Sequence, residues 1–217
     1  MKQYYEIVDV KARQITDEAL RPSLEAEVTL DDGSVGRASV PASVRNSREA
    51  ALAVENVNVE IAEALLAMNV LDQAYLDRML LELDGTETGE RLGANAILAS
   101  SLAIAKAAAL SSGVALYNYI GGVNAKRLPA VRTEADASAV SLSDCATLSQ
   151  FLDACALRRA EGKKLVLTAG ESETEDNILA DLAVALNAEE LVTGSVRVRN
   201  QLLRIEEELY DGVDEAL

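Results

Sequence analysis

The 217-residue sequence contains no histidine, no tryptophan and a single phenylalanine. Without histidine the chain cannot build a Ser-His-Asp or Cys-His relay, nor a zinc site with histidine ligands. Aromatic residues make up 3% of the chain and hydrophobic residues 49%, so alanine, leucine, valine and isoleucine must fill most of the core. Any catalysis would depend on Lys, Asp, Glu, Tyr, Cys or backbone amides.

Positive charge is scarce as well, because 20 Lys and Arg residues stand against 36 Asp and Glu residues, a net charge of −16. This balance argues against nucleic acid or an anionic membrane as a partner. The two cysteines, Cys145 and Cys155, form no Cys-x-x-Cys motif, and we interpret them as free thiols of a cytoplasmic protein. The most apolar stretch, residues 93–110, is rich in small residues and predicts a buried helix rather than a membrane span.

The first 130 residues predict an α+β domain. Apolar and polar residues alternate over residues 23–30, which is typical of a half-buried strand, and an Asp-Asp-Gly-Ser turn leads to a partner strand at residues 35–40. Residues 6–13 predict a strand before this hairpin. Helices are then indicated by apolar residues on one face, and a third helix is expected over residues 93–111. The two apolar faces are Val54, Val57, Ile61, Leu65 and Leu76, Met79, Leu80, Leu83.

Residues 131–217 predict alternating strands and helices, the pattern of a parallel sheet with crossover helices. Three short strands are expected, at residues 139–142, 165–168 and 190–196. Capping boxes at Thr147 and Ser172 predict two helix starts, a last helix covers residues 200–210, and residues 132–138 are interpreted as a linker. Because a (β/α)₈ barrel takes about 250 residues, only about three of its eight units fit here. The barrel cannot close within one chain, and its open sheet edges lead us to expect an oligomer.

Two stretches resemble the enolase family, whose members dehydrate 2-phosphoglycerate to phosphoenolpyruvate. Residues 83–129 contain LDGTE, LGANAIL, SLAIAKAAA, LYNYIGG and VNAKRLP, and residues 173–209 contain ETEDNILADLAVALNAEELVTGS and NQLLRIEEEL. They resemble the two ends of an enolase whose middle is missing. The resemblance implies an enolase-like α+β domain in residues 1–130 and a truncated (β/α) barrel in residues 131–217.

The resemblance also implies that the catalytic positions are replaced. The family's base, a lysine at the end of the sixth barrel strand, corresponds to Ser141, and the lysine that ends the eighth strand corresponds to Val192. The family's His-Arg-Ser run corresponds to residues 169–171, and its mobile serine loop to residues 42–47. The strands that carry the magnesium ligands fall in the missing segment. Enolate formation needs a base and dense positive charge, so we expect no metal, no cofactor and no enolase activity.

The candidate ligand-binding residues lie at predicted strand ends: Ser141, Glu171, Thr193, Gly194 and Ser195. Barrel folds bind ligands at this end, and the amides and hydroxyls of the Thr-Gly-Ser segment could cradle an anion. A turn that needs glycine is the simpler interpretation. Four acids between residues 171 and 176 could ligate Mg²⁺ or Ca²⁺, but we favour a role at a helix start, where acids complement the helix dipole.

The sequence thus favours a non-catalytic enolase-like protein that acts through protein–protein or ligand binding, as a homodimer or higher oligomer. Three alternatives stay open. The first is an enzyme of altered chemistry with a composite intersubunit cleft lined by Ser141, Thr168, Glu171 and Ser195. The second is a regulator that pairs with a genuine enolase. The third is a fragment with no selected role.

Overall fold

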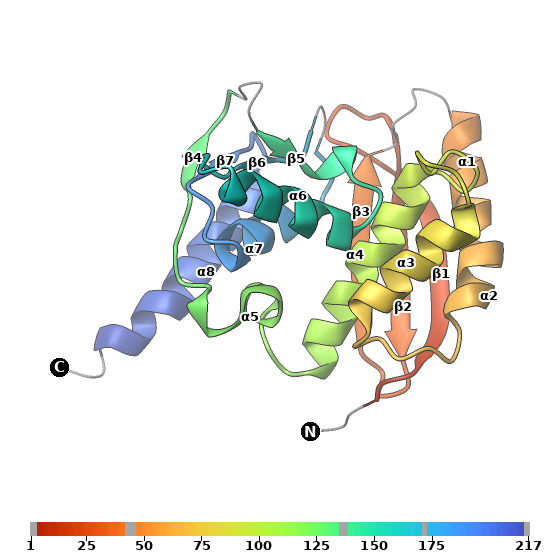
Figure 1. Cartoon of the computed structure of the whole chain (residues 1–217). Coiled ribbons are helices and arrows are strands. Elements are labelled where there is room, and N and C mark those ends of the chain that lie inside the picture. The colour runs from red at the N-terminus through yellow and green to blue at the C-terminus, as the bar shows by residue number, and fades with distance from the viewer. Residues whose placement is uncertain (1–3, 42–46, 135–138, 171–172, 215–217) are drawn as a thin grey trace.

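The computed structural model describes residues 4–41, 47–134, 139–170 and 173–214. The N-terminal half is a three-stranded antiparallel sheet with helices on one face, and the C-terminal half is a four-stranded parallel sheet with its own helices (Figure 1). Buried side chains from both halves form one contiguous hydrophobic core. This confirms the predicted α/β class, with a meander followed by a partial barrel.

The antiparallel sheet contains β1 (Ile7–Thr16), β2 (Pro22–Leu30) and β3 (Val35–Pro41) in that order. The predicted hairpin between β2 and β3 is confirmed, and Gly33 has a φ of +87° in its turn. The apolar residues of β2 point into the core, as their alternation predicted. They are Leu24, Ala26, Val28 and Leu30.

Helices cover the inner face of this sheet: α1 (Ser47–Asn56), a π-helical turn η1 (Val57–Ile61), α2 (Ala62–Leu65), α3 (Gln73–Asp84) and α4 (Ala94–Ser111). Helix α4 is long and apolar enough to cross a membrane by length and composition alone, but 72% of it is buried inside the protein, which identifies it as a core helix. It packs very close to β3, since a Cβ on Gly36 would lie 2.1 Å from the carbonyl oxygen of Ala103. The small residues of α4 permit this approach.

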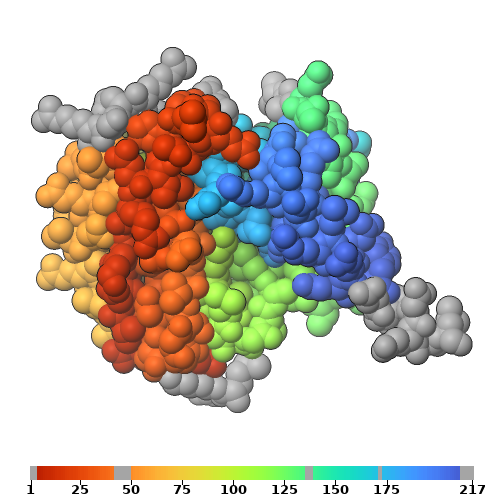
Figure 2. All heavy atoms as spheres, turned by 180° about the vertical axis from the view of Figure 1, so that it is seen from behind, coloured from red at the N-terminus to blue at the C-terminus, as the bar shows by residue number. Residues whose placement is uncertain are grey.

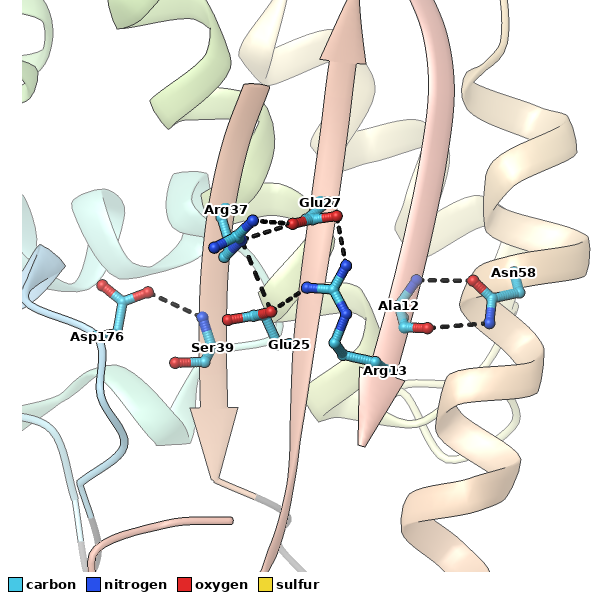
Figure 3. A network of polar contacts seen from close by, with 8 residues as sticks. All are labelled: Ala12, Arg13, Glu25, Glu27, Arg37, Ser39, Asn58 and Asp176. Atoms are coloured by element: carbon cyan, nitrogen blue, oxygen red, sulfur yellow. Dashed lines mark hydrogen bonds and ion pairs between the residues drawn. The ribbon is translucent and has the colours of Figure 1, made fainter. Parts of the chain in front are cut away.

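The outer edge of β1 is covered by the chain itself. Asn58, in the π-helical turn, accepts a hydrogen bond from the N–H of Ala12 at 2.7 Å and donates one to its carbonyl at 3.1 Å (Figure 3). Further along, Ile7 exchanges backbone bonds with Ala67 and Met68. An edge with its backbone groups satisfied is a poor template for another strand.

The parallel sheet contains β4 (Ala130–Arg132), β5 (Val140–Ser141), β6 (Val166–Thr168) and β7 (Glu190–Val192). Its order is β4-β7-β6-β5, so the first strand pairs with the last. The three expected strands are present as β5, β6 and β7, but a fourth was missed, because β4 begins at Ala130 and includes Arg132, which we had placed in the linker. A three-residue strand that ends in a charged residue has too few positions to show a period.

The helices of this half are α5 (Leu116–Gly121), α6 (Leu148–Ala160), α7 (Ile178–Ala185) and α8 (Val196–Asp214), with short 3₁₀ turns η2 (Gly122–Asn124) and η3 (Leu142–Asp144). The cap at Thr147 is confirmed, since its hydroxyl accepts from the N–H of Gln150 at 3.2 Å. The predicted start of α7 is wrong. The helix begins at Ile178, whose N–H bonds to Asp176 at 2.8 Å, while Ser172 lies outside the described residues.

The two edge strands of the parallel sheet, β4 and β5, hold only three and two residues. Very short edge strands are one of the ways in which proteins blunt an exposed sheet edge. Open edges therefore give little support to the expected oligomer, and any such argument has to come from the helical surfaces.

Asp176 joins the two halves at their junction. Its carboxylate accepts hydrogen bonds from the N–H of Ser39 on β3 at 2.8 Å and from the ammonium of Lys106 on α4 at 2.6 Å, and it also binds the start of α7 (Figure 3). Ser39 is tied a second time through its hydroxyl to Thr174 at 2.9 Å. These contacts fix the barrel half against the outer end of the antiparallel sheet.

Candidate functional site

A cleft of about 420 Å³ lies at the carboxyl ends of β4, β6 and β7, facing the loop that joins β1 to β2. In barrel folds this is the end at which ligands bind. Its lining is drawn from both halves of the chain. The lining residues are Glu18, Ala19, Arg21, Thr133, Thr168, Gly170, Glu173, Val192, Thr193 and Gly194.

The segment from Thr193 to Ser195 connects β7 to α8, so the strand expected over residues 190–196 ends at Val192 and the helix expected from residue 200 begins at Val196. The Thr193 hydroxyl donates a hydrogen bond to Glu173, and the N–H of Ser195 donates to Oγ1 of Thr193 at 3.0 Å. The neighbouring backbone N–H groups of Gly194 and Ser195 act to lower the pKa of the Glu173 carboxyl group. The cradle that we expected for an external anion is therefore filled by the chain's own Glu173. Sequence reasoning identified the cradle but not its occupant.

A second carboxylate, that of Glu18, lies beside this cradle. It accepts a hydrogen bond from the Ser195 hydroxyl at 3.0 Å, although the two residues are 177 positions apart. The backbone N–H of Glu18 also donates to the carbonyl of Glu173 at 3.1 Å. No local pattern in the sequence could have brought Glu18 to this site.

Burial and the nearby negative charge of Glu18 both raise the pKa of Glu173, with burial the larger cause. The hydroxyl and amide donors of the cradle act in the opposite direction because they stabilise the carboxylate. The result is a half-buried carboxyl group that holds its proton more tightly than an ordinary glutamate, next to a second acid and at the wall of an open cleft.

The loop that carries Glu18 is braced by Asp17, a buried residue. Its carboxylate accepts hydrogen bonds from the N–H groups of Ala19 at 2.9 Å and Arg21 at 2.8 Å, and from Nε of Arg21 at 2.8 Å. The Arg21 side chain remains 38% exposed. At the tip of the loop, Leu20 has a φ of +60° and is 82% exposed.

Ser141, at the end of β5, does not line this cleft. Its hydroxyl hydrogen-bonds to that of Ser143, an exposed residue, at 2.9 Å, and Gly170 lies against the pair. A Cβ on Gly170, where φ is +114°, would lie 2.1 Å from Oγ of Ser143. Thr168 and Thr193 do line the same cleft, whereas Glu171 lies outside the described residues.

Residues 7–120 match the sequence model of the enolase N-terminal domain, and residues 122–216 match that of the enolase C-terminal TIM barrel domain. The chain belongs to the enolase family. Its strand order then has a direct explanation, since the last strand of a closed barrel pairs with the first. In this truncated enolase-family chain, the β4–β7 pair occupies the place of that seam, and the absent barrel strands fall between β4 and β5.

The magnesium that enolase chemistry requires is poorly matched by the residues of this enolase-family chain. Within the described ranges, no three Asp, Glu, Cys or His side chains come together as metal ligands. The two carboxylates at the cleft, Glu18 and Glu173, are engaged by hydroxyl and amide donors. A small divalent ion needs several free oxygen ligands in octahedral geometry, and this donor set does not provide them.

Proposed function

We propose that this enolase-family chain is a non-catalytic protein that self-associates and acts through binding. The observation that carries the proposal is the occupied cradle, in which the Glu173 carboxylate accepts the hydrogen bond of the Thr193 hydroxyl and lies beside the following backbone amides. An oxyanion or phosphate would have to displace this carboxylate, and the adjacent Glu18 would repel it.

The position of Ser141 supports the same proposal. A serine whose hydroxyl is hydrogen-bonded to Ser143 is a poor base for removing a proton from a substrate carbon, because the pKa of an unactivated alcohol lies far above neutral. Ser141 is also not among the residues that line the cleft. Base and metal ligands would each contribute several kcal/mol to enolate formation.

The surface that we propose for self-association combines α8 with the loop between β1 and β2. Val196, Leu203 and Tyr210 recur every seven residues along α8 and are 67%, 57% and 56% exposed, so they form one apolar stripe. Leu20 stands across a groove of about 630 Å³ from the first of them. Figure 2 shows the strands of the antiparallel sheet and α8 on the same face of the molecule.

Charge on this face also fits a second copy of the chain. The outer side of the antiparallel sheet carries Arg13 and Arg37, bound to Glu25 and Glu27 and partly exposed (Figure 3). Exposed glutamates follow on α8, at positions 206–208. In a two-fold dimer each copy presents both elements, so the acidic helix of one copy can approach the arginines of the other. Each guanidinium has five N–H donors and can serve both carboxylates.

Analytical ultracentrifugation of Leu203→Asp tests the self-association. We expect the unmodified chain to sediment as a dimer at micromolar concentration and the variant to dimerise at least about tenfold more weakly, because it buries a charge in an apolar contact. Leu157→Asp is the matched control, since Leu157 is 64% exposed on α6, away from the proposed surface. A monomeric unmodified chain, or equal effects of the two substitutions, would contradict the proposal.

The non-catalytic character is tested with 2-phosphoglycerate and magnesium. We expect no product above the uncatalysed background. Turnover in the range of typical enzymes, about 1 to 1,000 per second, would overturn this part of the proposal.

An enzyme of altered chemistry is the second candidate, and one observation favours it. A carboxyl group with a raised pKa at the wall of a cleft, as Glu173 is, resembles the general acids and bases of active sites. If the chain converts a molecule that binds in this cleft, mass spectrometry of the incubated mixture will show a product. Recovery of the bound molecule unchanged would argue against this candidate.

A further inference from the structure

The cleft at the strand ends brings groups of both charges together from distant parts of the chain. Glu18 and Glu173 lie on its wall near the Thr193 cradle, and Arg21 lies on the loop that closes its other side. The hydroxyls of Thr133 and Thr168 complete the polar lining. A cleft of about 420 Å³ falls in the size range of small-molecule sites.

We propose that this cleft binds a small zwitterion of the amino-acid class, with its ammonium group at Glu18 and Glu173 and its anionic group at Arg21. The proposal goes beyond self-association, because every residue that it uses belongs to one copy of the chain. It assigns a ligand to residues that the fold brings together for no evident structural reason.

The ammonium end is assigned by the two carboxylates. Ionised carboxylates only accept hydrogen bonds, and an ammonium group has three donors and a full positive charge. Glu18 has one oxygen bonded to Ser195, and its side chain is exposed at the cleft. A cation between Glu18 and Glu173 offsets the repulsion between them, and burial in the cleft strengthens that attraction relative to bulk water.

The anionic end is assigned by Arg21 and by the charge of the whole protein. Nε of Arg21 donates a hydrogen bond to the Asp17 carboxylate. This bond fixes the position of the partly exposed Arg21 guanidinium on the loop. Guanidinium groups match carboxylates and phosphates in geometry. A net charge of −16 repels free anions, so a ligand that carries only an anionic group should bind poorly. A ligand of this cleft therefore needs an ammonium group as well.

The brace at Asp17 makes the cleft pre-organised. Its carboxylate holds the backbone of Ala19 and both ends of Arg21, so little of the loop has to be ordered when a ligand binds. The opposite wall is equally fixed, because Thr193 and Ser195 are buried and hydrogen-bonded. Pre-organisation lowers the entropic cost of binding and favours selection by length.

Calorimetry with a series of ω-amino acids tests the proposal. The probes are glycine, β-alanine, γ-aminobutyrate and δ-aminovalerate, whose charged ends lie progressively farther apart. We expect one member to bind with a dissociation constant of about 1 mM or tighter, and its neighbours in the series more weakly. The single-charge analogues n-butylamine and butyrate should bind at least about tenfold more weakly than the best zwitterion.

Two variants assign the contacts. Glu18→Gln should weaken binding of the best zwitterion and of n-butylamine together, whereas Arg21→Gln should weaken binding of the zwitterion and leave that of n-butylamine unchanged. Asp153→Asn, at an exposed acid on α6, is the matched control and should change neither. Leu203→Asp should bind the zwitterion as the unmodified chain does, which separates this test from the test of self-association. Thermal unfolding of each variant shows whether the loop still folds.

Three results would overturn the proposal: no measurable heat with any member of the series, equal binding of n-butylamine and the best zwitterion, or equal losses in Glu18→Gln and in the control Asp153→Asn. If Arg21→Gln lowers the unfolding temperature, Thr168→Val replaces it. Thr168 lines the cleft from β6, away from the loop between β1 and β2, and its hydroxyl accepts a long hydrogen bond from the N–H of Gly170 at 3.4 Å; its substitution should weaken binding of the zwitterion. Unchanged binding of the zwitterion in both Arg21→Gln and Thr168→Val would contradict the assignment of its anionic group to this side of the cleft.

Discussion

The Asp77 carboxylate accepts hydrogen bonds from both the backbone N–H and the hydroxyl of Ser149, at 2.9 and 2.6 Å. Asp77 lies on α3 in the N-terminal half, and Ser149 lies in the first turn of α6 in the barrel half. The neighbouring N–H of Leu148 donates to the hydroxyl of Ser101 on α4 at 2.9 Å. Helix starts leave several N–H groups unsatisfied, and here the other half of the chain caps two of them.

Asp77→Ala should destabilise the whole chain by about 3 kcal/mol, because it leaves buried donors on both halves without an acceptor. These donors include the hydroxyl of Ser101 at 2.6 Å and the side-chain amide of Gln73 at 2.9 Å. Urea unfolding measures the change. Asp153→Ala, an exposed acid on α6, is the control and should stay within about 0.5 kcal/mol. Equal effects would show that Asp77 does not join the halves.

Gly36→Ala should also destabilise the fold, by about 3 kcal/mol or more. The new Cβ would lie 2.1 Å from the carbonyl oxygen of Ala103 and 2.3 Å from the nitrogen of Ala107, and rigid helix backbone cannot yield as a flexible side chain does. Gly194→Ala is the control, since a Cβ there meets nothing within 4 Å. A small effect at Gly36 would mean that α4 and β3 are less tightly packed than described.

Much of the fold could be predicted because its signals are local. The alternation in residues 23–30 and the Asp-Gly turn gave β2 and β3, and the spacing of Leu148, Phe151 and Cys155 gave the buried face of α6. The strand at Ala130–Arg132 was missed because its evidence is a pairing with β7, about 60 residues away, and no period can be read in three residues.

The site was predictable only in part, for the same reason. The Thr193–Ser195 segment was identified from its position after a strand, but its partners Glu173 and Glu18 come from other elements. The predicted association of Ser141 with this segment is not found, because Ser141 does not line the cleft and bonds to Ser143 instead. Glu171, the remaining candidate, lies outside the described residues and stays a prediction.

Asp181 predicts a pH dependence of stability. Burial raises its pKa to about 6, helped by Asp176 and opposed by Lys106, by the amide of Gln201 and by the backbone of Tyr117. The folded state therefore binds the proton more tightly than the unfolded state does. The contribution of Asp181 is most favourable below the pKa of the unfolded chain, about 4, and is lost as the pH rises through about 6.

Asp181→Asn should accordingly be more stable than the unmodified chain at pH 7, by about 2 kcal/mol, and should have no advantage near pH 4. Taking the difference between the two proteins at each pH cancels the titration of the other carboxylates. Urea unfolding at several pH values measures it, with Asp153→Asn as the control. A difference that does not change with pH would show that folding does not raise the pKa of Asp181.

The contact between Gly170 and Ser143 leads to a final prediction. Gly170→Ala should destabilise the fold for two reasons. The backbone has a φ of +114°, which disfavours any residue with a side chain, and the new Cβ would lie 2.1 Å from Oγ of Ser143. We expect a loss of about 3 kcal/mol. Ser143→Ala removes the obstructing oxygen, together with the hydrogen bond to Ser141, and alone should cost about 1 kcal/mol.

In the double variant the steric cost falls and the backbone cost stays. Its loss in free energy of unfolding should therefore be at least about 1 kcal/mol smaller than the sum of the losses of the two single variants. Unfolding in urea of the four proteins in this cycle gives the coupling. Strict additivity would mean that the loop does not press on the serine pair. Strong coupling would support the close contact between Gly170 and Ser143.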